Sequence, residues 1–178
     1  KANNVASHGI FLAVMSSLFF LMFGIIGVPL FFKAQVDVSS PIYTYGVDYL
    51  KVVCIFSFGL FGQVATERLM QATGKSTLSM ATQLTGALIN IVLDPLFILG
   101  IGPFPRMEAK GAAVATVIGQ ICSFIIGIIL NEKYNKEINL HFRSFRPDIK
   151  LIANIYKIGV PSIIMVGIGS FMTFCFNK

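Results

Sequence analysis

The sequence predicts an all-α integral membrane protein with five transmembrane helices. Hydrophobic residues make up 55% of the 178 residues and charged residues only 12%, which is about half the charged fraction of a typical soluble domain. The charged residues also cluster between long apolar runs. Runs of about 20 apolar residues are long enough to cross a hydrocarbon core of ~30 Å as helices. The first expected partner is therefore the lipid bilayer.

Five apolar runs give the expected helices. They cover about residues 8–32, 46–67, 77–101, 111–131 and 158–178. The first run contains no charge between Ile10 and Phe32, and Pro29 is expected to kink or end its helix because proline lacks an N–H group. The second run is expected as one continuous helix whose far end is made polar by Gln63, Thr66 and Glu67.

The third and fourth runs each carry a polar stripe on one helical face, by the i, i+4, i+7 rule. The stripe residues are Gln83, Asn90 and Asp94 in the third run and Thr116, Gln120 and Ser123 in the fourth. A short loop joins the two runs, so they are expected to be antiparallel neighbours. If the stripes face each other, Thr116 lies near Asp94.

Asp94 is the residue of greatest functional interest. An acid within a transmembrane helix costs roughly 2.5–3.5 kcal/mol on insertion scales, and such residues usually bind ions or protons. The alternative is a buried carboxyl that bonds Asn90 and fixes packing. Interhelical amide bonds are common in membrane packing, so Gln83, Gln120 and Ser123 are assigned only as candidate lining of a substrate cavity.

Other functional classes find less support in the sequence. An embedded hydrolase needs a nucleophile with its base, a pair of acids or a histidine-rich metal site, and the apolar runs show no second mid-run acid and no mid-run histidine. A channel would be expected to show a filter loop or a charged ring. We therefore expect neither an enzyme nor a cofactor.

Two features of the sequence could suggest nucleotide or nucleic-acid binding, but neither supports it. Gly74-Lys75-Ser76 resembles the end of a phosphate-binding loop, but Leu69 stands where that motif requires glycine. A polar turn between two membrane helices fits better. The net charge of +6 is not gathered into a basic patch with interleaved aromatics, so no nucleic-acid partner is expected.

The distribution of basic residues predicts the orientation in the membrane. With five alternating crossings, nine basic residues fall on one side and five on the other. The larger set is Lys1, Arg68, Lys75, Lys133, Lys136, Arg143, Arg146, Lys150 and Lys157; the smaller is Lys33, Lys51, Arg106, Lys110 and Lys178. The larger set is expected in the cytoplasm, which suggests a multi-pass protein of the cell inner (plasma) membrane.

The ends of the chain and its longest polar stretch suggest a part of something larger. An odd number of crossings, with Lys1 and Lys178 directly flanking apolar runs, is expected of an internal fragment, whose missing remainder is a further partner. Residues 131–157 read as a cytoplasmic linker, in which Asp148 follows Pro147 as the predicted N-cap of a helical turn.

Several segments resemble the multidrug and toxic compound extrusion (MATE) family. They are Gln71-Ala-Thr-Gly-Lys-Ser-Thr, Asn90-Ile-Val-Leu-Asp-Pro-Leu-Phe-Ile-Leu-Gly100, Gly111-Ala-Ala-Val-Ala-Thr-Val-Ile-Gly-Gln120 and Gly159-Val-Pro-Ser162. The resemblance implies a twelve-helix transporter with two six-helix lobes, of which this chain is similar to helices three to seven. Residues 1–130 would then belong to the N-terminal lobe, 131–157 to the inter-lobe linker and 158–178 to the first helix of the C-terminal lobe.

The same resemblance implies a coupling site. The Asn and Asp of the family's fifth helix match Asn90 and Asp94, and the threonine early in its sixth helix matches Thr116; together they would bind Na⁺ or H⁺. The partner acid on helix one lies outside the chain. A second site that some members place on helix seven is not matched, because no acid occurs between Ile158 and Asn177.

The function implied by the resemblance is secondary active multidrug efflux. The protein would export small cationic or amphipathic compounds in exchange for Na⁺ or H⁺. Two alternatives stay open at this point: a lipid-linked saccharide flippase of the related superfamily, and a membrane scaffold that transports nothing.

Overall fold

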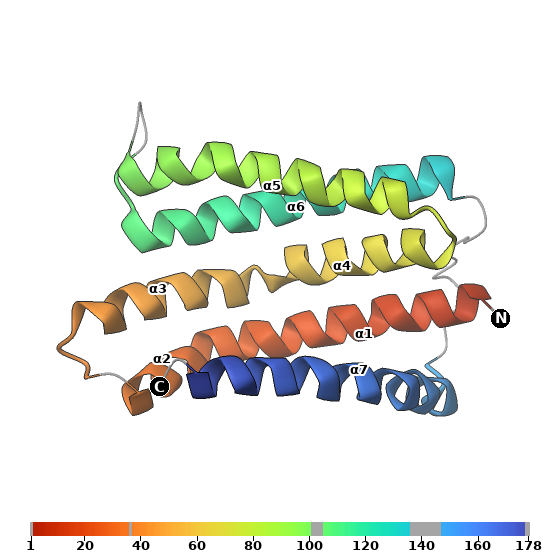
Figure 1. Ribbon diagram of the computed structural model, residues 1–178, viewed down its shortest axis with the longest axis horizontal. Helices are drawn as coiled ribbons and strands as arrows, with labels where there is room; N and C mark the ends of the chain where they lie inside the picture. Colours follow the sequence, from red (N-terminus) through yellow and green to blue (C-terminus); the bar gives the residue numbers. More distant parts are fainter. Residues whose placement is uncertain (1, 36, 101–104, 136–146, 177–178) are drawn as a thin grey trace. The chain divides into compact units, whose positions relative to one another are not determined.

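The computed structural model describes residues 2–35, 37–100, 105–135 and 147–176, and in these ranges the chain is helical apart from short connections, with no strand. The elements are α1 (Ala2–Met22), η1 (Phe23–Gly27), α2 (Val28–Gln35), α3 (Pro41–Ile55), α4 (Ser57–Ala72), α5 (Ser76–Leu99), α6 (Glu108–Tyr134) and α7 (Ile149–Phe176) (Figure 1). Four helical segments are long and apolar enough to cross a membrane, or five with the bent pair α3 and α4 taken as one span. The predicted all-α membrane fold is confirmed.

The chain divides into two compact units. One comprises Gly9–Asn139, and the other comprises Lys1–His8 with Leu140–Lys178. The first unit contains the polar stripes of α5 and α6, together with α2, α3, α4 and most of α1.

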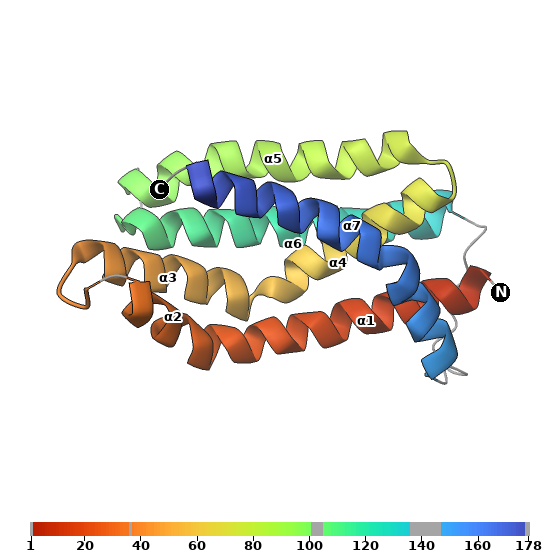
Figure 2. The same cartoon turned by 60° about the horizontal axis from the view of Figure 1, so that its bottom comes forward.

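The first span continues beyond Pro29 to Gln35. One π-helical segment, η1, precedes Pro29. In it the Val28 N–H donates to the Phe23 carbonyl, five residues back. Such a segment is a common response where the regular hydrogen-bond ladder is interrupted. The helix changes direction between α1 and α2 (Figure 2), so Pro29 kinks the span and does not end it.

The second span is broken, although the sequence predicts one continuous helix. α3 and α4 meet at Phe56 with a bend of 52° (Figure 2). Phe56 leaves helical geometry at φ −95° and ψ 19°, and the Ser57 hydroxyl donates to the Ser17 carbonyl at 3.3 Å. No proline lies near the break. The tertiary bond to α1 cannot be predicted from local sequence.

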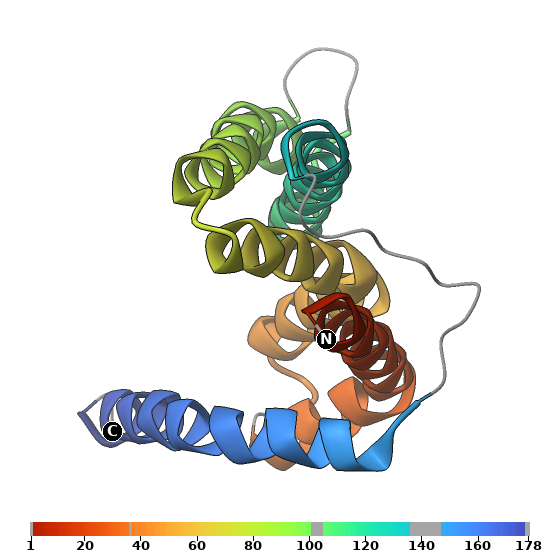
Figure 3. The ribbon, with the colours of Figure 1, turned by 90° about the vertical axis from the view of Figure 1, so that its right-hand side faces the viewer.

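α5 and α6 are antiparallel neighbours, as predicted, and they approach closely. A Cβ atom at Gly119 would lie 2.9 Å from the Gly86 carbonyl oxygen, so only glycine allows this spacing. α5 runs without interruption through Pro95 to a left-handed cap at Gly100. Seen nearly end-on in Figure 3, α4 lies beside this pair and completes a triangle.

The turn between α4 and α5 closes one end of the triangle. Gly74 adopts a positive φ of 75°, and the Lys75 ammonium donates to the Tyr134 carbonyl at the end of α6. A cation is favourable at a helix C-terminus. The Asn131 amide donates to the Thr66 carbonyl at 3.0 Å and so joins α6 to α4. The basic turn therefore holds helix ends together.

The second unit contains α7 and the beginning of α1. Asp148 caps α7 as predicted: its Oδ1 accepts from the Lys150 N–H at 2.9 Å, and its own N–H donates to His8 Nε2 at 2.9 Å. α7 begins at Ile149 and passes through Pro161. Residues 149–157, predicted as linker, are therefore helical because the cap starts the helix earlier; residues 136–146 of the predicted linker lie outside the described residues.

Candidate functional site

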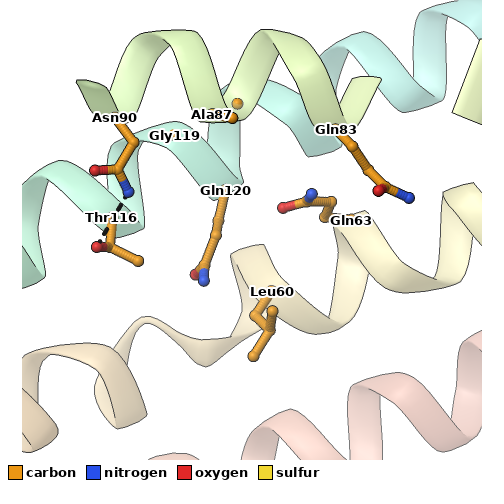
Figure 4. Close-up of a pocket in the computed structure, with 9 residues that line it drawn as sticks. Leu60, Gln63, Gln83, Ala87, Asn90, Thr116, Gly119 and Gln120 are labelled. Carbon is orange, nitrogen blue, oxygen red and sulfur yellow. Dashed lines mark hydrogen bonds between the residues drawn. The ribbon is translucent and has the colours of Figure 1, made fainter. Parts of the chain in front are cut away.

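A cavity of about 230 Å³ lies between α4, α5 and α6 (Figure 4). Its lining is mostly polar side chains and small residues: Leu60, Gln63, Gln83, Gly86, Ala87, Asn90, Thr116, Gly119 and Gln120. The glycines and the alanine open the space, while amides from all three helices surround it. The two sequence-predicted stripes thus face each other across one cavity.

Most of the predicted polar residues lie in the cavity wall. Gln83, Asn90, Thr116 and Gln120 line it. Ser123 does not: it is fully buried, its hydroxyl donates to the Thr82 carbonyl at 3.0 Å, and it packs against Gly86. Ser123 shares the helical face of Thr116 and Gln120, but the close approach of α5 and α6 seals it into the packing. Ser123 therefore does not line the cavity between α4, α5 and α6.

Asp94 is not among the residues that line the cavity, but it joins Asn90 and Thr116, which line it, in a continuous polar chain. The two terminal atoms of the Asn90 amide point in different directions. One lies 2.6 and 3.0 Å from the two Asp94 carboxylate oxygens, and the other lies 3.2 Å from Thr116 Oγ1. Thr116 also bonds the Ala112 carbonyl at 2.9 Å.

The Asn90 amide fits best with its nitrogen toward Asp94, because that orientation satisfies both of its polar atoms. The nitrogen then donates to both carboxylate oxygens, and the oxygen accepts from Thr116 Oγ1. The opposite orientation, drawn in Figure 4, would set the amide oxygen against the carboxylate, acceptor against acceptor.

Glu67 is a buried acid whose position the sequence does not indicate. It lies on α4, is 7% exposed, and accepts from Gln63 Nε2 at 2.9 Å and from Gln83 Nε2 at 3.0 Å. From the sequence, Gln63, Thr66 and Glu67 make the far end of the second span polar, which does not distinguish a buried acid from a boundary one. The signal that would have located it is the four-residue spacing of Gln63 and Glu67, which places an amide over a carboxyl on one face of the helix.

The donor set at Asp94 suits hard cations. Asp94, Asn90 and Thr116 offer only oxygen atoms and one amide nitrogen, and oxygen ligands bind hard metal ions such as those of groups 1 and 2. Among the described residues, no group of three or more His, Cys, Asp or Glu side chains comes together. A site for a multivalent transition metal is therefore not formed by this part of the chain.

Comparison with known proteins identifies the chain's relatives. The MatE family model matches residues 1–96. The multidrug export protein MepA of Staphylococcus haemolyticus is 29% identical over 128 residues, which are 72% of this chain and 27% of MepA. The probable multidrug resistance protein NorM of Bacillus cereus is 24% identical over 160 residues, 89% of this chain and 35% of NorM.

A solved structure shares the fold. The inward-facing conformation of a multidrug resistance MATE family transporter of the MOP superfamily superposes with a TM-score of 0.80 at 22% identity, covering 90% of this chain and 36% of that one. The chain thus spans about a third or less of the length of these relatives. From the family match over more than half of its residues, together with this fold, the chain belongs to the MatE family.

Proposed function

We propose that the protein to which this chain belongs is a secondary active multidrug efflux antiporter. It exports small cationic or amphipathic compounds in exchange for H⁺ or Na⁺. Two findings support this: the matched relatives are named multidrug export and multidrug resistance proteins, and the bundle encloses a polar cavity between apolar helices. Such cavities near the interior of a helical bundle are where transporters bind their substrates and ions.

The observation that carries the coupling role is the polar chain of Asp94, Asn90 and Thr116, which joins α5 to α6 within apolar helices. Asp94 is the acid that would take the ion, and Asn90 donates to its carboxylate. Because Asn90 also meets Thr116 on α6, ion binding at Asp94 would alter the contact between two helices that line the cavity.

Either candidate ion could neutralise Asp94. A proton would convert the carboxylate into a hydroxyl donor. Na⁺ would draw on the oxygens of Asp94, Asn90 and Thr116, and further ligands would come from the rest of the protein.

The arrangement within the whole protein is part of the proposal. Residues 1–130 would belong to the N-terminal lobe, 131–157 would connect the lobes on the cytoplasmic side, and 158–178 would open the C-terminal lobe, in the plasma membrane. The separation of α7 from the unit Gly9–Asn139 supports this division. Alternating access would rock one lobe against the other.

The test is Asp94→Asn in the full-length protein. Ethidium efflux from energised cells should fall to background, because Asn cannot exchange a proton or carry the charge that binds Na⁺. Asp37→Asn, which changes an exposed acid, is the matched control and should transport normally. Efflux at the wild-type rate in Asp94→Asn would refute the coupling role, and loss of the folded protein would indicate that Asp94 only stabilises packing.

A further inference from the structure

Behind the amides at the end of the cavity away from Asp94 lies a buried acid, Glu67. Glu67 is 7% exposed, and the Gln83 that bonds it lies eleven residues before Asp94, about 16 Å along the axis of α5. The ion pair recorded for the described residues, Arg106 with Glu108, is elsewhere. Within the described part of the chain, no cation compensates Glu67, and a buried carboxylate without one is costly.

The carboxylate fixes the orientation of two cavity amides. Gln63 donates its NH₂ group to Glu67 Oε1 and Gln83 donates its NH₂ group to Oε2. Because the nitrogens face Glu67, the carbonyl oxygens of both amides are left for other donors. Both residues line the cavity, and bonding to an anion strengthens an amide as an acceptor on its other side.

A third amide completes an acceptor-rich subsite. Gln120 comes from α6 and lines the same cavity, and its Oε1 is buried without a hydrogen-bond partner among the described residues. An unsatisfied buried acceptor is costly, so it marks a place where a donor is bound in some state of the protein. Figure 4 shows Gln63, Gln83 and Gln120 around the space between their helices.

We propose that Gln63, Gln83 and Gln120, together with the negative charge of Glu67, form a subsite for a cationic N–H donor group such as an ammonium, amidinium or guanidinium. The negative charge of Glu67 favours a cation, and the amide oxygens that its bonds leave free favour one that carries hydrogen-bond donors. A cavity of about 230 Å³ accepts such a head group but is smaller than a typical drug-sized pocket. Glu67 is a positioning residue, since it acts through the amides.

The subsite deepens the proposed efflux function, and its test is made independent of ion coupling. The full-length protein in detergent is titrated at pH 7 with naphthylmethylammonium and with its N,N,N-trimethyl analogue, which has the same charge and no N–H donor. The wild type should bind the primary ammonium about tenfold more tightly, the typical size of a charge-assisted hydrogen bond. Because no gradient is involved, a failure of the proposed ion coupling would leave this measurement unaffected.

Glu67→Gln should lose most of the preference while keeping the shape of the side chain, and Glu67→Asp should restore part of it by keeping the charge. Gln120→Leu should also lower the preference and should fold normally, since its buried oxygen has no described partner to lose. Asp37→Asn is again the matched charge control. A folded Gln120→Leu or Glu67→Gln that retains the tenfold preference would overturn the proposal.

Discussion

The two ends of the cavity solve the same problem differently. At one end Asp94 is followed along a single helix face by Asn90, and the amide meets Thr116 across the α5–α6 contact. At the other end Glu67 on α4 receives two amides, one from its own helix and one from α5. The first carboxylate is bonded by one amide and the second by two. Fewer bonds must change when Asp94 takes up an ion, so the Asp94 end is better suited to ion exchange and the Glu67 end to keeping a fixed charge.

The contact that both ends share is the close approach of α5 and α6, and breaking it should have the largest effect. In Gly119→Val the new Cβ would stand 2.9 Å from the Gly86 carbonyl oxygen and 3.7 Å from Asn90 Cβ. We expect the helices to separate at a cost of about 1–3 kcal/mol, with a lower melting temperature in detergent and loss of both efflux and binding preference.

The matched control for this change is Gly9→Val, because nothing lies within 4 Å of a Cβ at Gly9. It introduces the same β-branched residue into a helix without a new contact. If Gly9→Val lowered the melting temperature as much as Gly119→Val, the cause would be helix propensity and the helix–helix spacing would not be limiting.

The second prediction concerns the Asp94 end of the cavity. Asn90→Leu removes the donor that an ionised Asp94 receives, a charge-assisted bond whose loss costs about 1.5–3 kcal/mol. Efflux from energised cells should fall by roughly 10–100-fold, whereas the binding preference at Glu67 should persist.

The control for Asn90→Leu is Asn131→Leu, which removes another interhelical amide bond, from α6 to the Thr66 carbonyl, away from Asp94. It should lower thermal stability with little further effect on efflux by the folded fraction. Equal efflux losses in the two variants would mean that Asn90 serves packing alone.

The sequence predicts the Asp94 end and misses the Glu67 end for a physical reason. Asp94, Asn90 and Thr116 lie on regular helices whose facing stripes follow from the 3.6-residue period and a short connecting loop. Glu67 lies beyond the break at Phe56, where the direction of α4 departs from that of α3 by 52°. The break is accompanied by a tertiary bond from Ser57 to Ser17 and is not marked by proline, so local sequence indicates one span with Glu67 at its polar end.

The assignments of Ser123 and Gln120 show the same limit at the level of single side chains. Both share the stripe of Thr116, yet Ser123 is sealed against Gly86 while Gln120 lines the cavity. Periodicity gives the face of a helix, but the distance to the neighbouring helix decides which residues of that face are packed and which remain open. That distance is set by glycines whose partners are known only in the fold.

A smaller effect is expected at Thr116, which meets Asp94 only through Asn90. Thr116→Val keeps the shape but removes the hydroxyl, a neutral hydrogen bond worth about 0.5–1.5 kcal/mol, so efflux should fall by roughly 2–10-fold. Thr116→Ser should restore it.

The matched control is Thr85→Val on α5, since Thr85 donates to the Ala81 carbonyl at 2.8 Å just as Thr116 donates to Ala112. Thr85 makes no described bond to Asn90. If both valine variants reduced efflux equally, the role of Thr116 would be local to its own helix.

The smallest expected effect is the coupling between the two ends themselves. Asp94 and Glu67 share no hydrogen-bond partner, and Gln83 lies about 16 Å from Asp94 along α5. Sites separated by more than about 7–10 Å without shared partners usually behave additively to within ~0.5 kcal/mol. The binding free energy of naphthylmethylammonium should therefore give a double-mutant cycle of Asp94→Asn and Glu67→Gln that closes within that margin. A coupling free energy well above ~0.5 kcal/mol would mean that the charge at one end sets the occupancy of the other. Asp94 and Glu67 would then belong to a single ion-exchange site.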